Sequence, residues 1–226
     1  MSKTANHMYD LSGVLPIEAL SDVRAGSTLL ISGPALSGKD EFALDVLGDG
    51  VRDGQGAIAV TTGGDGTDWI TDIDARAGSV PGYSVAAIDC RSERGRSEEE
   101  LDNEAFHYSV AEPSDLTGIG IGITKCFSRL QNAGITETRL ALTSLSTMLT
   151  YSDRKTTFEF CHVLSSRLDS AGFLGVFTID SSAHDEQTMQ VIKQAFDGQI
   201  ELRNTDGATE ARFRGLDTGT TGWLSL

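Results

Sequence analysis

The sequence predicts an α/β fold with a mainly parallel sheet flanked by helices and a short antiparallel extension at the C-terminus. Three observations support this prediction. Short apolar runs of strand length alternate with segments whose apolar residues recur at helical spacing. A glycine-rich turn with one lysine joins an early run to a helical segment. The last apolar runs follow one another with only Gly and Asp turns between them, which favours antiparallel pairing.

The expected elements alternate along the chain. Strands are predicted at 27–32, 56–62, 83–90, 139–145 and 173–180, and closing strands at 199–203, 208–214 and 222–226. Helices are predicted at 40–47, 68–76, 115–133, 155–171 and 186–195. Glycines should stop the first helix, at Gly48, and break the third early, at Gly118, Gly120 and Gly122. The polar segment Arg91–Glu104 is expected to be an exposed loop or a loose helix. Without a repeat or a linker, residues 1–226 are expected to form a single domain.

Composition excludes several classes of protein. There is no run of 18 apolar residues, so no membrane span is expected. Residues 1–10 lack the basic and apolar regions of a signal peptide. The cysteines, Cys90, Cys126 and Cys161, are too far apart for paired metal ligands and are expected to be buried, reduced thiols. These features together predict a cytoplasmic protein.

The charge balance is strongly acidic. Asp and Glu total 33 against 18 Lys and Arg, which gives a net charge of −15. Such a surface repels phosphate backbones, so a nucleic-acid partner is not expected. Acidic residues are dispersed along the chain and lysines are few, as in proteins of halophilic archaea, where salt screens self-repulsion. An ordinary acidic protein is the alternative.

One motif carries the main functional prediction. The segment Gly33-Pro34-Ala35-Leu36-Ser37-Gly38-Lys39-Asp40 follows a strand and opens a helix, the context of a phosphate-binding loop. Backbone N–H groups of such a loop and the helix N-terminus bind phosphate oxygens, and Lys39 would reach the outer phosphates. The alternative is a glycine turn with a solvated Lys39. Asp40 takes the place of the Ser or Thr that usually binds Mg²⁺. It favours the helix N-terminus but repels a triphosphate unless a metal or Lys39 neutralises it.

With this motif the chain resembles the RecA/KaiC superfamily, and specifically the KaiC-like proteins common in haloarchaea. Residues 15–39, LPIEALSDVRAGSTLLISGPALSGK, are similar to the segment that enters that fold, and the likeness extends through the strand order to nearly the whole chain. The resemblance implies a RecA-like P-loop domain that binds ATP or ADP.

Three positions depart from the family pattern. Asp40 replaces the hydroxyl residue of the loop, and Thr143, followed by Ser144, stands where the Walker B strand should end in Asp. Gly63 and Gly64 stand where the family carries one or two Glu that activate water. The nearest acids there are Asp65 and Asp68. Hydrolysis should therefore be weak or absent, because phosphoryl transfer depends on a placed Mg²⁺ and an oriented water. Mg²⁺ binding is left open, with Asp40 and Asp180 as the candidate ligands.

The resemblance also implies a role for the segment Arg212-Phe213-Arg214-Gly215. KaiC-like proteins often end with a basic-x-basic-Gly strand that reaches the nucleotide of a neighbouring subunit, so a homo-oligomer is a candidate assembly. Arg212 and Arg214 should project from the same face of a strand. Charged residues that protect an edge strand from aggregation are the alternative.

Three functions remain open at this stage. The preferred one is a nucleotide-binding regulatory or signalling protein that acts through protein partners. The others are an active ATPase whose catalytic acid has moved, to Asp40 or Asp65, and an interaction scaffold without nucleotide. His107, His162 and His184 show no ligand spacing, and there is no G-x-S-x-G motif for hydrolase chemistry. Whether the chain is an enzyme is left open.

The net charge generates a first prediction. Because salt screens repulsion among the excess carboxylates, the melting temperature should rise between low and molar KCl. Thermal melts followed by circular dichroism at both salt concentrations measure this. Equal melting temperatures would contradict the halophilic interpretation.

Overall fold

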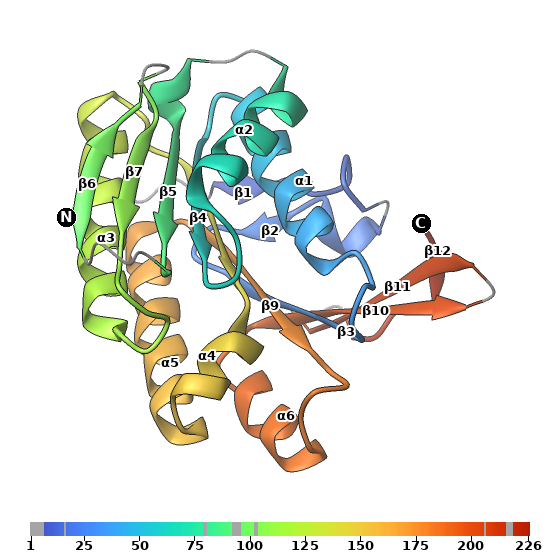
Figure 1. The fold of residues 1–226 in the computed structure, drawn as a ribbon. Helices are drawn as coiled ribbons and strands as arrows, with labels where there is room; N and C mark the ends of the chain where they lie inside the picture. Colours follow the sequence, from blue (N-terminus) through green and yellow to red (C-terminus); the bar gives the residue numbers. More distant parts are fainter. Residues whose placement is uncertain are drawn as a thin grey trace.

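The computed structural model describes residues 7–15, 17–78, 81–91, 96–101, 104–205, 207–215 and 219–226. Within these ranges a ten-stranded sheet runs through the molecule, in the order β12-β11-β10-β3-β9-β8-β4-β5-β7-β6 (Figure 1). From β10 to β7 neighbouring strands are parallel, whereas β11, β12 and β6 are antiparallel to their neighbours. This confirms the predicted parallel sheet and its antiparallel C-terminal extension.

The strands of the large sheet follow the predicted runs closely, apart from β6 and β7, for which no strand was predicted. Those of the large sheet are β3 (Thr28–Gly33), β4 (Gly56–Thr61), β5 (Val85–Asp89), β6 (Ser97–Glu100), β7 (Phe106–Ser109), β8 (Thr138–Thr143), β9 (Leu174–Asp180), β10 (Gly198–Thr205), β11 (Ala208–Gly215) and β12 (Leu224–Ser225). A separate two-stranded sheet near the N-terminus contains β1 (Met8–Tyr9) and β2 (Val23–Arg24).

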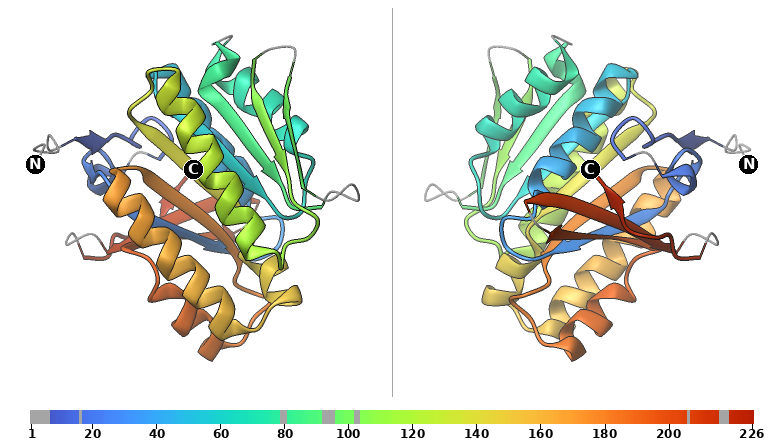
Figure 2. Two further views of the ribbon diagram at one scale, coloured as in Figure 1. Left: turned by 90° about the vertical axis from the view of Figure 1, so that its left-hand side faces the viewer. Right: turned by 90° about the vertical axis from the view of Figure 1, so that its right-hand side faces the viewer.

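Helices cover both faces of the sheet (Figure 2). The helices α1 (Lys39–Arg52) and α2 (Gly66–Ala77) pack on one face, and the other carries α3 (Leu116–Asn132), α4 (Leu145–Tyr151), α5 (Arg154–Ala171) and α6 (Glu186–Lys193). Two short 3-10 helices, Glu18–Leu20 and Gly82–Ser84, precede β2 and β5. Along β3, Leu29 and Ile31 enter one core and Leu30 the other, as the alternation of strand side chains requires.

The expected stop of the first helix at Gly48 is wrong, because α1 continues to Arg52. Its glycines permit close packing rather than ending the helix. A Cβ at Gly48 would lie 2.5 Å from Cβ of Arg76 on α2, and one at Gly50 would lie 2.6 Å from the Arg139 side chain. Tertiary packing therefore requires glycine at these two positions, although glycine has a lower helix propensity than other residues.

The expected early break at the glycines of the third helix is also wrong. The helix α3 is continuous from Leu116 to Asn132, with Asp115 as its N-cap. Gly122 lies against the Tyr108 ring of β7, where a Cβ would approach to 2.6 Å. Gly122 thus brings the helix close to the sheet.

Part of the segment expected to be a loop or loose helix forms β6, which pairs antiparallel with β7 at the edge of the sheet. Its acidic side chains are held by α3, where Glu98 pairs with Lys125 and Glu100 with Arg129. The polar sequence hid the strand because every residue of β6 is exposed. Residues 92–95 and 102–103 of this segment, and residues 1–6 of the leader, lie outside the described residues.

A further helix, α4, fills a segment for which the sequence predicted no helix. The predicted strand 139–145 ends at Thr143, and Ser144 then caps α4 by accepting a hydrogen bond from the N–H of Ser146 at 3.2 Å. Because the Ser144 hydroxyl caps a helix, it favours the start of α4 over continuation of the strand.

The three cysteines are buried and unpaired, as predicted. Burial raises the pKa of the Cys161 thiol to about 12 and also raises those of Cys90 and Cys126, so none is a reactive thiolate at neutral pH. In the described part of the chain, no helix is both long and apolar enough to cross a membrane.

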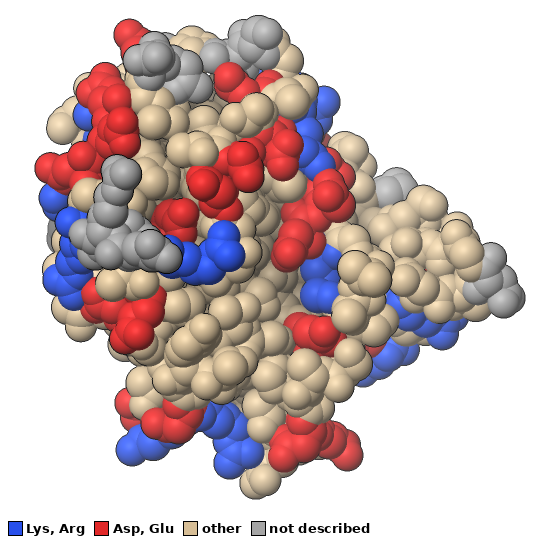
Figure 3. Space-filling model, in the orientation of Figure 1, with Lys and Arg blue, Asp and Glu red and all other residues tan. Residues whose placement is uncertain are grey.

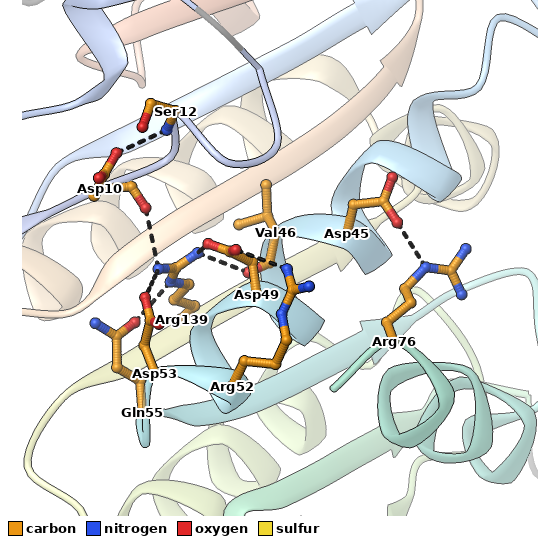
Figure 4. A network of polar contacts seen from close by, with 10 residues as sticks. All are labelled: Asp10, Ser12, Asp45, Val46, Asp49, Arg52, Asp53, Gln55, Arg76 and Arg139. Carbon is orange, nitrogen blue, oxygen red and sulfur yellow. Dashed lines mark hydrogen bonds and ion pairs between the residues drawn. The ribbon is translucent and has the colours of Figure 1, made fainter. Parts of the chain in front are cut away.

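A buried guanidinium fixes the amino end of the sheet. Arg139 is the second residue of β8. Its side chain is only 1% exposed and lies between α1 and the N-terminal segment (Figure 4). Its Nη1 donates to the Val46 carbonyl and to Asp49 Oδ2, both at 2.9 Å. Its Nε donates to Gln55 Oε1 at 2.7 Å, and its Nη2 to the Asp10 carbonyl at 3.2 Å. Four hydrogen bonds thus satisfy most of the donors of this buried charge.

This network generates a second prediction. Replacing Arg139 by Met should lower the free energy of unfolding by about 3 kcal/mol, because Gln55 and two carbonyl groups lose their partner in a dry site and Asp49 keeps only the exposed Arg52. Urea unfolding measures this loss. The matched control is Arg52→Met, which removes the exposed partner of the same Asp49 and should cost less than about 1 kcal/mol. Equal losses in the two variants would contradict the assigned role.

Candidate functional site

The carboxyl ends of the parallel strands bring the predicted site residues together. In the register of β3 and β9, Gly33 lies opposite Asp180, and the Ser181 N–H donates to the Gly33 carbonyl at 2.9 Å. One strand further on, β8 ends at Thr143, opposite Thr61 of β4. Ligands of open parallel sheets bind at this edge.

The Gly33–Asp40 loop leaves β3 and leads directly into α1, as the motif predicts. Gly33 has no room for a side chain, since a Cβ there would lie 2.5 Å from Ser37 Oγ. Leu36 has a φ of 58° and its side chain is 97% exposed at the tip of the loop. The Asn204 amide of β10 donates to the Leu36 carbonyl at 3.3 Å, which ties the tip to the C-terminal hairpin.

The N-terminus of α1 has no side-chain cap. Its N-cap is Gly38, in the left-handed region at φ 79°, whereas each of the other α-helices in the described ranges starts at an Asp or Ser whose side chain accepts from the first turn. The first N–H groups of a helix have no intrahelical acceptor. In α1 they are left for an external acceptor, and the helix dipole favours an anion there.

The Lys39 ammonium lies against the loop. Its Nζ donates to the Pro34 carbonyl at 2.6 Å and to Ser37 Oγ at 3.3 Å. Partial burial lowers the pKa of Lys39, and the carboxylates of Asp180 and Asp40 oppose this shift. Both carbonyl and hydroxyl are neutral acceptors, so an arriving phosphate oxygen would be a stronger partner for the ammonium.

Asp40 and Asp180 are the carboxylates that act on the charge of Lys39. Asp40 Oδ1 accepts from Thr178 Oγ1 of β9 at 3.2 Å. Burial acts to raise the pKa of Asp180, but hydrogen bonds from Ser182 and the charge of Lys39 hold it below its ordinary value. No group of three or more His, Cys, Asp or Glu that could hold a metal occurs among the described residues. Two carboxylates nevertheless suit Mg²⁺, which takes its other ligands from phosphate and water.

Thr143 and Ser144 lie at the expected end of β8, and Thr143 is buried. The Ser144 N–H donates to Thr62 Oγ1 at 2.6 Å, and that hydroxyl donates to the Ser144 carbonyl at 3.1 Å. These bonds tie the ends of β8 and β4 to each other without a carboxylate. The Ser144 side chain is used as the α4 cap.

The two acidic residues near the end of β4, Asp65 and Asp68, differ in their contacts. Asp65 caps α2, accepting from the N–H of Thr67 at 2.8 Å and from its hydroxyl at 2.7 Å, and these bonds hold the pKa of Asp65 below its usual value. Asp68 is exposed in the first turn of α2. A Cβ at Gly63 would meet nothing within 4 Å, whereas one at Gly64 would lie 3.0 Å from Trp69 Nε1.

Arg212 and Arg214 project from the same face of β11 and reach one carboxylate. Glu201 of β10 pairs with Arg212 and, at 3.4 Å, with Arg214. Arg212 and Arg203 also lie over the Trp223 ring, 4.4 and 4.0 Å from its centroid. Basic side chains gather beneath the lobe formed by this hairpin, whereas acidic ones are spread over the rest of the face shown (Figure 3). The shared face was expected from the i, i+2 spacing; the stacking on Trp223 was not.

The structure adds two residues that sequence reasoning missed. His184, in the loop after β9, lies with its Nε2 2.8 Å from Ser146 Oγ of α4, and the Asp180 N–H donates to the same hydroxyl at 2.9 Å. His184 also lines a cavity of about 520 Å³ together with Pro34 and Ser181. No spacing in the sequence signals this contact, because the two residues are 38 positions apart.

The other side of the loop borders a second cavity. This groove has a volume of about 620 Å³ and lies between α1 and the C-terminal hairpin. Its walls combine apolar and polar groups, among them Val14, Ser37, Gly38, Phe42, Leu202, Thr209 and Leu226. A mixed lining with a few polar groups is typical of small-molecule sites.

Comparison with solved structures identifies the fold. A KaiC-like protein from the hyperthermophilic archaeon Pyrococcus horikoshii OT3 superposes with a TM-score of 0.66 at 12% identity, over 98% of this chain and 94% of that one. At this identity the likeness shows the fold alone, so the chain has the KaiC/RecA-like α/β fold. No curated protein matches the sequence. A family model described as a family of unknown function, DUF7504, matches residues 26–202, and the chain belongs to that family.

The crowding at Gly33 generates a third prediction. Gly33→Ala should destabilise the protein by about 1–3 kcal/mol, because the new methyl group would press on Ser37 and on the Leu202 carbonyl. The matched control is Gly63→Ala, which faces open space and should stay within about 0.5 kcal/mol of the parent. Urea unfolding of both variants measures this, and an unchanged Gly33→Ala protein would contradict the loop packing.

Proposed function

We propose that this chain binds ATP or ADP through the Gly33–Asp40 loop and acts as a regulatory or signalling protein with weak or absent hydrolysis. The observation that carries the proposal is the uncapped N-terminus of α1, with Lys39 held beside it by neutral acceptors. A diphosphate or triphosphate supplies the acceptors that these donors lack. The groove beside Ser37 and Gly38 offers room for a base and ribose.

Charge counting supports a bound cation beside the nucleotide. Lys39 contributes one positive charge, whereas Asp40 and Asp180 contribute two negative charges, so the loop does not neutralise a phosphate chain. Asp40 and Asp180 are the residues that would hold Mg²⁺, which would neutralise phosphate charge. Nucleotide affinity should therefore depend strongly on Mg²⁺.

Slow hydrolysis follows from the groups at the ends of β4 and β8. Thr143, Gly63 and Gly64 supply no carboxylate to orient a metal or a water, and Thr62 and Ser144 bond to each other. Losing one transition-state contact commonly lowers a rate by about 10²–10³. Output would then come from nucleotide occupancy and protein partners rather than from turnover.

An active ATPase with a displaced acid is the second candidate. Asp40 favours it, since its carboxylate lies close enough to Lys39 to oppose the shift in the lysine pKa. Asp65 fits less well because the α2 cap engages its carboxylate. A scaffold without nucleotide is the third candidate. Within the main proposal, Arg212 and Arg214 would reach a neighbouring subunit's nucleotide only after leaving Glu201.

The wider setting is also proposed. Residues 1–226 would form a single domain, and the net charge of −15 suits the salt-rich cytoplasm of a halophilic archaeon. Thr143, Gly63 and Gly64 would then be degenerate versions of the motifs of active KaiC-type ATPases.

The fourth prediction tests the proposal. Calorimetry in molar KCl with Mg²⁺ should detect ATP or ADP binding to the parent protein, and a phosphate-release assay should detect little turnover. Lys39→Ala should abolish binding, whereas Thr143→Ala should change little. Lys155→Ala is the control for loss of a lysine, since Lys155 is exposed and far along the chain from the loop.

The outcomes separate the three candidates. Tight binding without release supports the regulatory proposal. Release at the rate of an ordinary KaiC-type ATPase favours a displaced acid, and Asp40→Asn and Asp65→Asn then show which carboxylate acts. No binding by the parent protein, even in molar KCl, leaves the scaffold.

A further inference from the structure

The helices α3 and α5 leave an apolar groove on the surface. Its volume is about 440 Å³, and it is lined by Leu116, Thr117, Gly120, Ile121, Thr124, Lys125, Phe160, Val163 and Arg167. Val163 is 53% exposed and Ile121 is 39% exposed, which is high for large apolar side chains. Gly120 keeps the α3 side of the groove low. A hollow of this kind suits the ridge of another helix.

The charges of the groove differ from those of the protein as a whole. Although the chain carries a net charge of −15, no Asp or Glu lines the groove among the described residues, where its charged members are Lys125 and Arg167. Lys125 is paired with Glu98. Arg167 lies near Gly120 and makes no ion pair in the described part of the chain. An arriving carboxylate would therefore find an available cation.

The exposed side of α5 carries such a carboxylate itself. Glu159 and Arg167 stand four residues before and four residues after Val163, so they flank it on the same helical face. Glu159 is 62% exposed and has only a long contact of 3.7 Å with Lys155. Glu159, Val163 and Arg167 therefore form a stripe along α5 that is negative, then apolar, then positive.

We propose that this groove binds a second copy of the chain, with the two α5 helices antiparallel about a two-fold axis beside Val163. Such an axis places residue 163+n of one copy level with residue 163−n of the other. Val163 would then pack against Val163 of the partner subunit, and Arg167 would lie level with Glu159 of the partner subunit. By symmetry the second ion pair forms as well.

Self-complementarity favours a second copy over another partner. An isologous interface needs the same patch to supply both members of each contact, and the Glu159, Val163 and Arg167 stripe meets that condition. The lack of acid in the groove removes repulsion where the copies touch, and salt screens the remaining repulsion between two acidic proteins. The interface uses neither the Gly33–Asp40 loop nor the C-terminal hairpin, so this dimer needs no nucleotide.

The fifth prediction concerns this dimer. Sedimentation equilibrium without nucleotide, in low and in molar KCl, should show a dimer for the parent chain. Val163→Glu should weaken the dimer by at least about a hundredfold, because it buries two unpaired carboxylates. Glu159→Arg and Arg167→Glu should each weaken it by about tenfold. The double variant Glu159→Arg/Arg167→Glu should recover most of the loss, because it restores both pairs with the charges exchanged.

Two controls keep the result specific. Tyr151→Glu places a carboxylate on α4 at an exposed position outside the groove and should leave the dimer intact. Circular dichroism melts should show that every variant stays folded. A monomeric parent chain at both salt concentrations would overturn the proposal, as would a dimer that is insensitive to Val163→Glu. Failure of the charge exchange to rescue would overturn the two-fold pairing.

Discussion

The buried guanidinium of Arg139 is the interaction on which the arrangement of this molecule depends most. It joins the start of β8 to α1 through Val46 and Asp49, and to the N-terminal segment through Asp10. A charge in so dry a place is tolerated only because its hydrogen-bonding groups have partners. The same side chain demands a glycine at position 50, so α1 is held close to the sheet. This packing helps to position the helix that begins where the Gly33–Asp40 loop ends.

The path of the Gly33–Asp40 loop is restrained, but the first N–H groups of the helix that follows it have no side-chain acceptor. Gly33 and the tie from Asn204 to Leu36 restrain its path, whereas Gly38 leaves the first turn of α1 without a cap. Every other α-helix in the described residues spends a side chain on its first turn. The helix α1, which begins at the Gly33–Asp40 loop, therefore lacks the stabilisation of a side-chain cap, which is about 1 kcal/mol.

Hydroxyl groups rather than carboxylates stand at the neighbouring ends of β4 and β8. Thr62 and Ser144 exchange hydrogen bonds and lock β4 to β8, which a pair of carboxylates could not do without repulsion. Asp40 and Asp180 place negative charge next to Lys39.

The sequence by itself determined the alternation of strands and helices, the loop between β3 and α1, and the common face of Arg212 and Arg214, because these depend on local periodicity and spacing. Tertiary structure decided what local rules could not. Gly48 was expected to stop the helix, yet close contact with Arg76 makes it a packing residue, as close contact with Arg139 does for Gly50. The exposed strand β6 has no apolar alternation and exists only because β7 and α3 bind it. The contact of His184 with Ser146 required the loop after β9 and the first turn of α4 to reach the same sheet edge, and no sequence spacing encodes such a contact.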